Sequence, residues 1–151
     1  MDYMIAQDRR AARLVIVDSA LQVLLFQYED HRGKWWATPG GGLEPSESFA
    51  DAAAREAREE VGLTRLAMEP VWDRWTEFES RGVLLRQEEC YFLLRTEGST
   101  LQFDDVRQAH EIEGILAARW WPLAQLRSTT ELVLPEDLAV RIDQLIATGR
   151  L

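Results

Sequence analysis

The segment from Gly40 to Leu63, GGGLEPSESFADAAAREAREEVGL, places three consecutive glycines before an alanine-rich stretch that is dense in charge. Glu56, Glu59 and Glu60 fall within about one and a half turns of the helix that this stretch predicts. Glycine lets the backbone turn tightly and leaves its amide and carbonyl groups open to a ligand. The segment is therefore either a solvated acidic helix face behind a loop or a site in which carboxylates hold divalent cations.

The sequence delimits this helix at both ends. Ser48 suits the N-cap, Asp51 three residues later completes a capping-box pattern, and Gly62 suits the position just after the helix. An apolar stripe at helical spacing predicts the face that packs on a sheet, and it consists of Ala50, Ala54, Ala57 and Val61. At about 100° per residue the three glutamates fall on the opposite face, which predicts that they point away from the packed side.

Carboxylate oxygens at this spacing match the ligands that magnesium and manganese ions prefer. Glu56 lies three residues before Glu59 and four before Glu60, so the three carboxylates can converge. Without a cation these like charges destabilise the helix, and Arg55 compensates only part of the repulsion. A carbonyl near Gly40 could join the carboxylates, and amides of the glycine loop could meet phosphate oxygens. The pattern predicts an Mg²⁺ site that Mn²⁺ could also fill.

The composition limits the classes of partner. Hydrophobic residues make up 46% and charged residues 28% of the 151 residues, which is typical of a folded protein, and we expect residues 1–151 to form a single domain. The 26 acidic and 17 basic residues give a net charge of -9, which argues against binding of nucleic acid or anionic membranes. Cys90 is the lone cysteine, so no internal disulfide is expected. No apolar stretch approaches about 18 residues and no apolar signal core is visible, so a cytoplasmic location is expected.

Runs rich in β-branched and aromatic residues predict strands on both sides of the helix. They span residues 12–18, 22–30, 34–39, 70–78, 83–97 and 119–123. The first two are separated by a short turn and predict a hairpin. Residues 102–118 fit either a loop or a helix, and we take most of them as loop. A short helical turn is expected over residues 123–126.

A second amphipathic helix is predicted over residues 135–149. Pro135 suits its first position and Gly149 the position after its end. Its predicted buried stripe consists of Leu138, Ile142, Leu145 and Ile146. Strands first, then a helix, then more strands and a final helix predict an α/β fold with a mixed sheet covered by helices on both faces.

The spacing of the charged helix resembles a known family signature. From Gly41 the chain reads glycine, five residues, glutamate, seven residues and then REAREEVGL. This is similar to the Nudix box of the Nudix hydrolases, and its fixed positions are all present: Gly41, Glu47, Arg55, Glu56, Glu59, Glu60 and Gly62, followed by Leu63. Ala57 departs from the pattern, because the family usually places a larger aliphatic residue there. That change removes packing beneath the helix but no ligand.

The resemblance implies a Nudix-like α/β/α sandwich that hydrolyses a nucleoside diphosphate linked to another moiety. Mg²⁺ held by Glu56, Glu59 and Glu60 would bridge the pyrophosphate oxygens and help activate a water for in-line attack on phosphorus. Glu56 is a candidate general base, although a glutamate from a later loop often serves in the family. Glu47 and Arg55 resemble the pair that fixes the loop against the helix rather than metal ligands.

Acidic residues outside the box are weaker candidates. Glu111 and Glu113 precede Arg119–Trp121, in a region where family members supply an extra ligand or base, and its spacing favours Glu111. A solvated loop position is at least as good a reading for each. Glu88 and Glu89 begin a strand and would point to opposite faces, so that one could enter the site, although surface exposure is the expected position of either.

The aromatic and histidine residues near these motifs could lie in the core, at the surface or against a ligand. Trp35 and Trp36 would point to opposite sides of a strand, so one is expected in the core and the other could stack on a base or sugar. His31 and His110 have no ligand or triad spacing and are expected at the surface. No serine-nucleophile, P-loop or dinucleotide motif is present.

The sequence indicates the substrate less firmly than it indicates the type of reaction. In the family a proline 15 to 18 residues past the box accompanies activity on ADP-ribose, and a tyrosine accompanies diadenosine polyphosphate hydrolysis. Residues 78–81 read FESR and contain neither. A nucleoside triphosphate, including an oxidised one, is therefore favoured as a small-molecule substrate, and a homodimer is compatible with the resemblance. The alternative is a nucleotide-sensing module without turnover, but such relatives usually lose glutamates of the box.

Overall fold

A computed structural model describes residues 7–64, 67–80, 82–97, 103 and 107–151. Within these residues the strands are β1 (Gln7–Asp18), β2 (Gln22–Asp30), β3 (Gly33–Ala37), β4 (Gly40–Gly42), β5 (Glu69–Ser80), β6 (Val83–Thr96), β7 (Ala117–Pro122) and β8 (Val133–Leu134). The helices are α1 (Phe49–Glu56), which continues into a π-helical turn η1 (Ala57–Val61), α2 (Arg107–Glu113), α3 (Leu123–Ser128) and α4 (Leu138–Ala147). The six predicted strands are thus confirmed, although β1 begins five residues before its predicted start, and β8 was not predicted.

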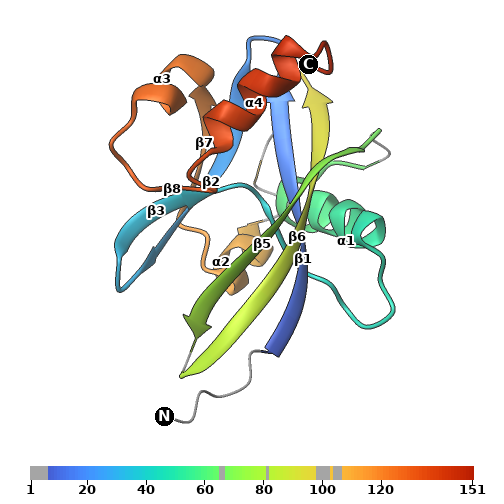
Figure 1. The fold of residues 1–151 in the computed structure, drawn as a ribbon, viewed down its shortest axis with the longest axis vertical. Helices are drawn as coiled ribbons and strands as arrows, with labels where there is room; N and C mark the ends of the chain where they lie inside the picture. The colour runs from blue at the N-terminus through green and yellow to red at the C-terminus, as the bar shows by residue number, and fades with distance from the viewer. Residues whose placement is uncertain (1–6, 65–66, 81, 98–102, 104–106) are drawn as a thin grey trace.

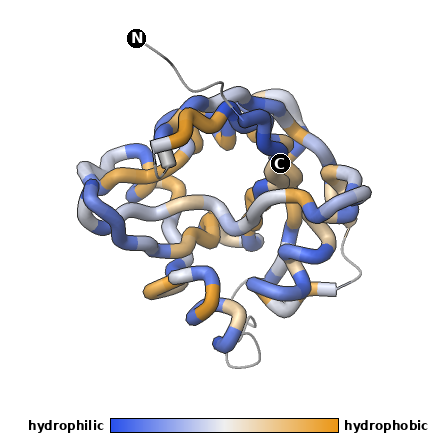
Figure 2. The backbone as a smooth tube through the Cα atoms, turned by 90° about the horizontal axis from the view of Figure 1, so that it is seen from below, coloured by the Kyte–Doolittle hydropathy of each residue, from blue (hydrophilic) through white to orange (hydrophobic). Residues whose placement is uncertain are grey.

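The strands form one mixed, curled sheet (Figures 1 and 2). Its order is β5-β6-β1-β2-β3-β8, with β4 paired to β1 and β7 paired to β2. The β1–β6 and β3–β8 pairs are parallel and the other pairs are antiparallel. The predicted hairpin of β1 and β2 is confirmed, since Val17 pairs with Val23. In its middle β1 therefore lies between β6 on one side and the glycines of β4 on the other.

Alternation along β1 divides the core between the two faces of the sheet. Val15 and Val17 pack in a cluster with residues of α3 and α4, whereas Leu14 and Ile16 pack in a cluster with residues of α1. α1 and α4 consequently cover opposite faces (Figure 1). This arrangement confirms the expected α/β/α sandwich.

The predicted caps of α1 are confirmed. Ser48 Oγ accepts a hydrogen bond from the Asp51 N–H at 3.0 Å, and Asp51 Oδ2 accepts one from the Ser48 N–H at 3.3 Å. Gly62 ends the helical segment in a left-handed conformation with φ of 74°, which glycine adopts with little strain.

The predicted apolar stripe of this helix is wrong in its first two positions, whereas Ala57 and Val61 are buried as predicted. Ala50 and Ala54 are exposed. The buried side consists of Ala52, Ala53, Glu56, Ala57, Glu60 and Val61. Alanine occurs on nearly every side of this helix, so its spacing carries little directional information. The two buried glutamates therefore face inward rather than away from the packed side.

Three further expectations need correction. The glycine loop contains a short strand, β4, because its backbone pairs with residues 11–13 of β1. Residues 107–113, expected as loop, form α2, while most of the preceding residues lie outside the described part. The last helix begins at Leu138, because Pro135 precedes it in a turn whose carbonyl accepts from the Leu138 N–H. Its predicted end at Gly149 is confirmed by a φ of 74°.

The capping box gives a first testable prediction. Ser48→Ala removes the side-chain acceptor for a backbone N–H at the start of α1, and we expect a loss of about 1 kcal/mol of unfolding free energy. For a chain of this size this corresponds to a fall of about 2–4 °C in melting temperature. Thermal unfolding by circular dichroism would measure it, with the exposed turn residue Ser19 changed to alanine as control. Equal melting temperatures for both variants would contradict the prediction.

Candidate active site

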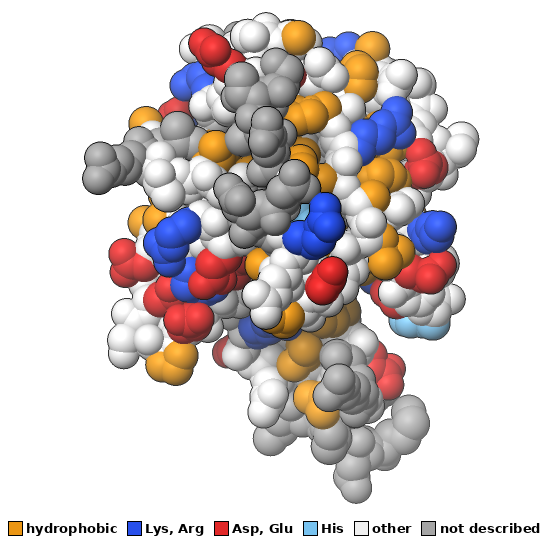
Figure 3. Space-filling model, turned by 180° about the vertical axis from the view of Figure 1, so that it is seen from behind, with side chains coloured by type: hydrophobic (Ala, Val, Ile, Leu, Met, Phe, Trp, Pro, Cys, Tyr) orange, Lys and Arg blue, Asp and Glu red, His pale blue; other side chains and the backbone are white. Residues whose placement is uncertain are grey.

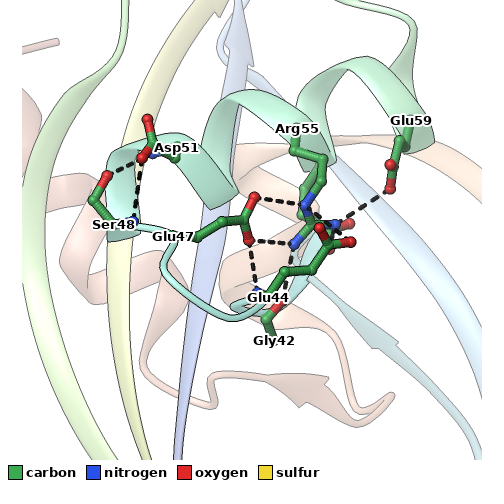
Figure 4. Close-up of polar contacts among 8 residues, drawn as sticks. Gly42, Glu44, Glu47, Ser48, Asp51, Arg55 and Glu59 are labelled. Atoms are coloured by element: carbon green, nitrogen blue, oxygen red, sulfur yellow. Dashed lines mark hydrogen bonds and ion pairs between the residues drawn. The ribbon is translucent and has the colours of Figure 1, made fainter.

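Arg55, at the end of α1, joins the helix to the segment that precedes it (Figure 4). Its Nε and Nη2 donate to the two carboxylate oxygens of Glu47 at 2.8 and 2.9 Å, and Nη2 also donates to the Gly42 carbonyl at 3.0 Å. Its Nη1 donates to Glu56 at 3.0 Å and to Glu59 at 3.3 Å. The hydrogen bonds from Arg55 lower the pKa of Glu47 to about 2. The bidentate pair that the sequence suggested is therefore present, and it ties the loop to the helix.

Glu56 and Glu60 lie on the buried side of the helical segment. Glu60 is only 2% exposed, and its Oε2 accepts a hydrogen bond from the Gly40 N–H at 3.1 Å. Its carboxyl group also hydrogen-bonds that of Glu56. Burial raises the pKa of both groups, and the nearby charge of Glu56 raises the pKa of Glu60 further. Two carboxyl groups held together away from water favour a shared proton or a bound cation.

The glycines let the backbone approach these carboxyl groups. A Cβ on Gly41 would lie 2.7 Å from Oε1 of Glu56, which is closer than a side chain can come without moving that carboxylate. Gly40 has a φ of +139°, and a Cβ there would lie 2.1 Å from the carbonyl oxygen of Ala12. Both positions therefore require glycine, one for the carboxylate and one for the pairing of β4 with β1.

Glu59 differs from the other two glutamates because it is exposed and reaches Arg55 from the solvent side. Acidic side chains and arginines gather over this part of the surface, at the left in Figure 3. Among the side chains that the structure describes, no three of the metal-ligating types form one cluster. The carboxylate oxygens nevertheless suit a hard divalent cation as ligands, because the two buried carboxyl groups of Glu56 and Glu60 lie side by side against a glycine backbone.

The family model for the NUDIX domain matches residues 7–146. The chain belongs to the Nudix family. Its box places Arg55 at the centre of a hydrogen-bond network and two of its glutamates inside the fold.

Individual Nudix relatives are distant. The chain is 31% identical to an RNA pyrophosphohydrolase of Vibrio cholerae over 62% of each chain, so it spans less than two thirds of that relative's length. It is 30% identical to the human 8-oxo-dGDP phosphatase NUDT18 over 70% of this chain and 29% of that one. The NUDIX domain of Shewanella oneidensis NrtR, solved with ADP ribose, superposes with a TM-score of 0.70 at 16% identity, covering 94% of this chain and 90% of that domain. That last likeness shows the Nudix fold alone.

Two residues lie beside the Nudix carboxylates although the sequence did not predict them there. His110, expected at the surface, donates from Nε2 to the Glu60 carbonyl at 2.6 Å and packs against Phe26. Tyr28 lies near the same carboxylates, since burial and then the charge of Glu60 raise the pKa of its hydroxyl. Neither has a recognisable sequence spacing to the box.

The acidic candidates outside the box differ in their positions in the structure. Glu111 lies exposed on α2 with no contact to the carboxylate pair, so any role for it stays a prediction. Glu113, on the same helix, lies close enough to Tyr28 to affect the pKa of its hydroxyl. Glu89 is buried, which corrects the expectation of exposure, while Glu88 lies on the other face and is partly exposed.

The remaining expectations concern apolar and aromatic residues. Trp36 is buried in the core, and Trp35 stacks on Tyr28 with ring centroids 4.8 Å apart, so one tryptophan points to each side as predicted. Cys90 is buried, and burial raises the pKa of its thiol to about 12. No helix in the described ranges is long and apolar enough to cross a membrane.

Gly41 gives a prediction that separates activity from stability. Gly41→Ala places a methyl group against Glu56, which can swing aside because it is the end of a flexible side chain. We expect turnover of a nucleotide substrate to fall by about tenfold or more, since a displacement of about 1 Å at a reacting site can have a large effect. The melting temperature should change little. Ser19→Ala, at an exposed turn position, is the control, and an unchanged rate for Gly41→Ala would contradict the prediction.

Proposed function

We propose that this protein hydrolyses a pyrophosphate linkage in a nucleoside diphosphate derivative with the help of a divalent cation. The observation that carries the proposal is the pair of buried carboxyl groups of Glu56 and Glu60 beside Gly40 and Gly41. Burying two adjacent acids in a protein of net charge -9 lowers its stability, and the ion pair of Arg55 with Glu56 offsets only part of that loss. Membership of the Nudix family and the names of its relatives support the same reaction.

The residues present suit Mg²⁺, with Mn²⁺ as a substitute. Glu56, Glu60 and the exposed Glu59 would hold it, together with the Gly40 carbonyl. When bound, the cation would neutralise phosphate charge and lower the pKa of a coordinated water. Arg55 keeps Glu56 and the glycine segment in register through its contacts with Glu47 and Gly42. The chain thus supplies preorganised oxygens and a fixed backbone, and Glu56 is our candidate for the base.

We favour a nucleoside triphosphate, including an oxidised one, as substrate. The relatives named as an RNA pyrophosphohydrolase and as an 8-oxo-dGDP phosphatase leave the class of nucleotide undecided. We further propose that residues 1–151 act as one domain, in the cytoplasm, without nucleic acid or membrane partners and as a homodimer. Glu111 is retained as a candidate for assisting the reaction from α2.

A substrate panel tests the proposal directly. Purified protein would be incubated with nucleoside triphosphates, nucleotide sugars, diadenosine polyphosphates and triphosphorylated RNA, each with Mg²⁺ and with EDTA. We expect hydrolysis of a pyrophosphate linkage in at least one compound, detected by separating its two phosphorylated products, and only with the cation. Tight binding of a nucleotide without turnover would favour the sensing module instead. Turnover that persisted in EDTA would contradict the proposed cation-dependent mechanism.

A further inference from the structure

A second buried polar cluster lies across β1 from α1. Arg13 of β1 alternates with Val15 and therefore points to the face that α4 covers, away from α1. On β6, the carboxylate of Glu89 is 5% exposed. It accepts hydrogen bonds from Gln87 Nε2 at 2.9 Å, Tyr91 Oη at 3.2 Å and Arg13 Nε at 3.3 Å. Three donors converging on one buried carboxylate fix the orientation of the side chains that supply them.

Two members of this cluster have hydrogen-bonding capacity left over. Gln87 is 3% exposed, and its Oε1 has no hydrogen-bond partner. Its amide cannot simply be turned around, because Glu89 accepts the bond from Nε2. Arg13 uses only Nε, and its Nη1 and Nη2 make no hydrogen bond to the part of the chain that the structure describes. Buried acceptors without donors are rare in native proteins, so Gln87 Oε1 is available to a donor group from outside the described residues.

The cluster adjoins the carboxylate pair through a single residue. Arg13 is the cross-strand partner of Gly40, and a Cβ on Gly40 would lie 3.0 Å from Cδ of Arg13. The same glycine donates its N–H to Glu60. A ligand that extends past Gly40 can therefore touch both Arg13 and the carboxylates.

The chemistry of the cluster suits a phosphate group less well than a ligand that carries N–H donors. A phosphate offers acceptors to Arg13, but it has no donor for Gln87 Oε1 and would lie close to the charge of Glu89. A nucleobase edge offers both acceptors and N–H donors in one plane. Arginine and the amide side chains are the groups that read such edges elsewhere.

We propose that Arg13 and Gln87, oriented by Glu89, recognise the base of the nucleotide substrate. Arg13 supplies several N–H donors and Gln87 a single acceptor, which matches a base edge with two acceptors beside a ring N–H, as in guanine. The inference rests on the proposed function for the identity of the ligand as a nucleotide. Glu89 is a positioning residue, because it acts through the two side chains that it orients.

Steady-state kinetics test the proposal with variants that keep side-chain volume. Gln87→Met and Arg13→Met should each lower kcat/KM for GTP by about tenfold, mainly through KM, and should leave hydrolysis of inorganic tripolyphosphate unchanged. Glu88→Gln, on the same strand but the opposite face, is the matched control and should behave as wild type. Equal losses for both substrates would show a merely structural cluster and overturn the proposal.

Equilibrium binding tests the subsite even if turnover is absent. Protein labelled with ¹⁵N would be titrated with GMP, AMP, CMP and UMP in EDTA while the side-chain signals of Gln87 and Arg13 are followed by NMR. We expect both signals to shift, with GMP binding at least about fivefold more tightly than AMP. Shifts confined to other residues, or equal affinity for all four nucleotides, would overturn the assignment. A positive titration with an inactive enzyme would separate this inference from the proposed function.

Discussion

Glu60→Gln is expected to lower turnover by at least about a hundredfold, a loss comparable to removing one group that stabilises developing charge. The substitution keeps the shape of the side chain and an oxygen that can accept from the Gly40 N–H, but it removes the negative charge that a cation needs. The fold should therefore remain. The measurement is kcat at saturating Mg²⁺ on the best substrate of the panel, together with the rise in melting temperature that Mg²⁺ causes.

The control for this variant is Glu79→Gln, which neutralises an exposed glutamate on β5. It should change neither kcat nor the effect of Mg²⁺. If Glu60→Gln kept the wild-type kcat and the wild-type rise in melting temperature with Mg²⁺, Glu60 would not be part of the cation site. This conclusion would hold for any reaction that the protein catalyses.

The same carboxyl group predicts how stability changes with pH. Burial raises the pKa of Glu60 above its ordinary value of 4.5. Its contribution to stability is thus fully present below about pH 4.5 and is lost as the pH rises through the raised value. In EDTA the melting temperature of the wild type should therefore fall relative to that of Glu60→Gln between about pH 5 and pH 9. Parallel curves would contradict the burial of a titrating carboxyl group.

Arg55→Ala is expected to have the largest effect on stability. It removes the hydrogen bonds to Glu47 and Gly42 and leaves Glu56 buried without its cationic partner. Breaking a partly buried ion pair from one side costs about 2–4 kcal/mol once solvent screening is allowed for. We expect a fall of about 5–15 °C in melting temperature and a large loss of turnover, because the glycine segment is no longer fixed.

Two comparisons make the Arg55 prediction specific. Arg58→Ala, an exposed position in the turn that follows α1, should change the melting temperature little. Acid should reduce the difference between Arg55→Ala and the wild type, since the pKa of Glu47 is lowered to about 2 and the contribution of the pair is lost as the pH falls from about 4.5 toward that value. A difference that stayed constant down to pH 2 would exclude the Glu47 pair as its source.

The local features of this chain were predictable because they depend on neighbouring residues. The capping box of Ser48 and Asp51 and the left-handed Gly62 each involve only a few consecutive positions. The bidentate pair of Glu47 and Arg55 spans eight residues within one motif. Strands were predicted for the same reason, because runs of β-branched and aromatic residues mark them locally. The helix α2 was missed because its seven residues carry no clear apolar period.

The sequence by itself determined the Nudix signature, six of the described strands and the ends of the first helix, because short-range spacing and backbone preference decide them. Only the tertiary structure decided which side of that helix is buried, since alanine on every side gave no direction, and packing against β1 turned Glu56 and Glu60 inward. It also decided the cluster of Arg13 and Glu89. These residues are 76 positions apart, and only the parallel pairing of β1 with β6 brings them within hydrogen-bonding distance.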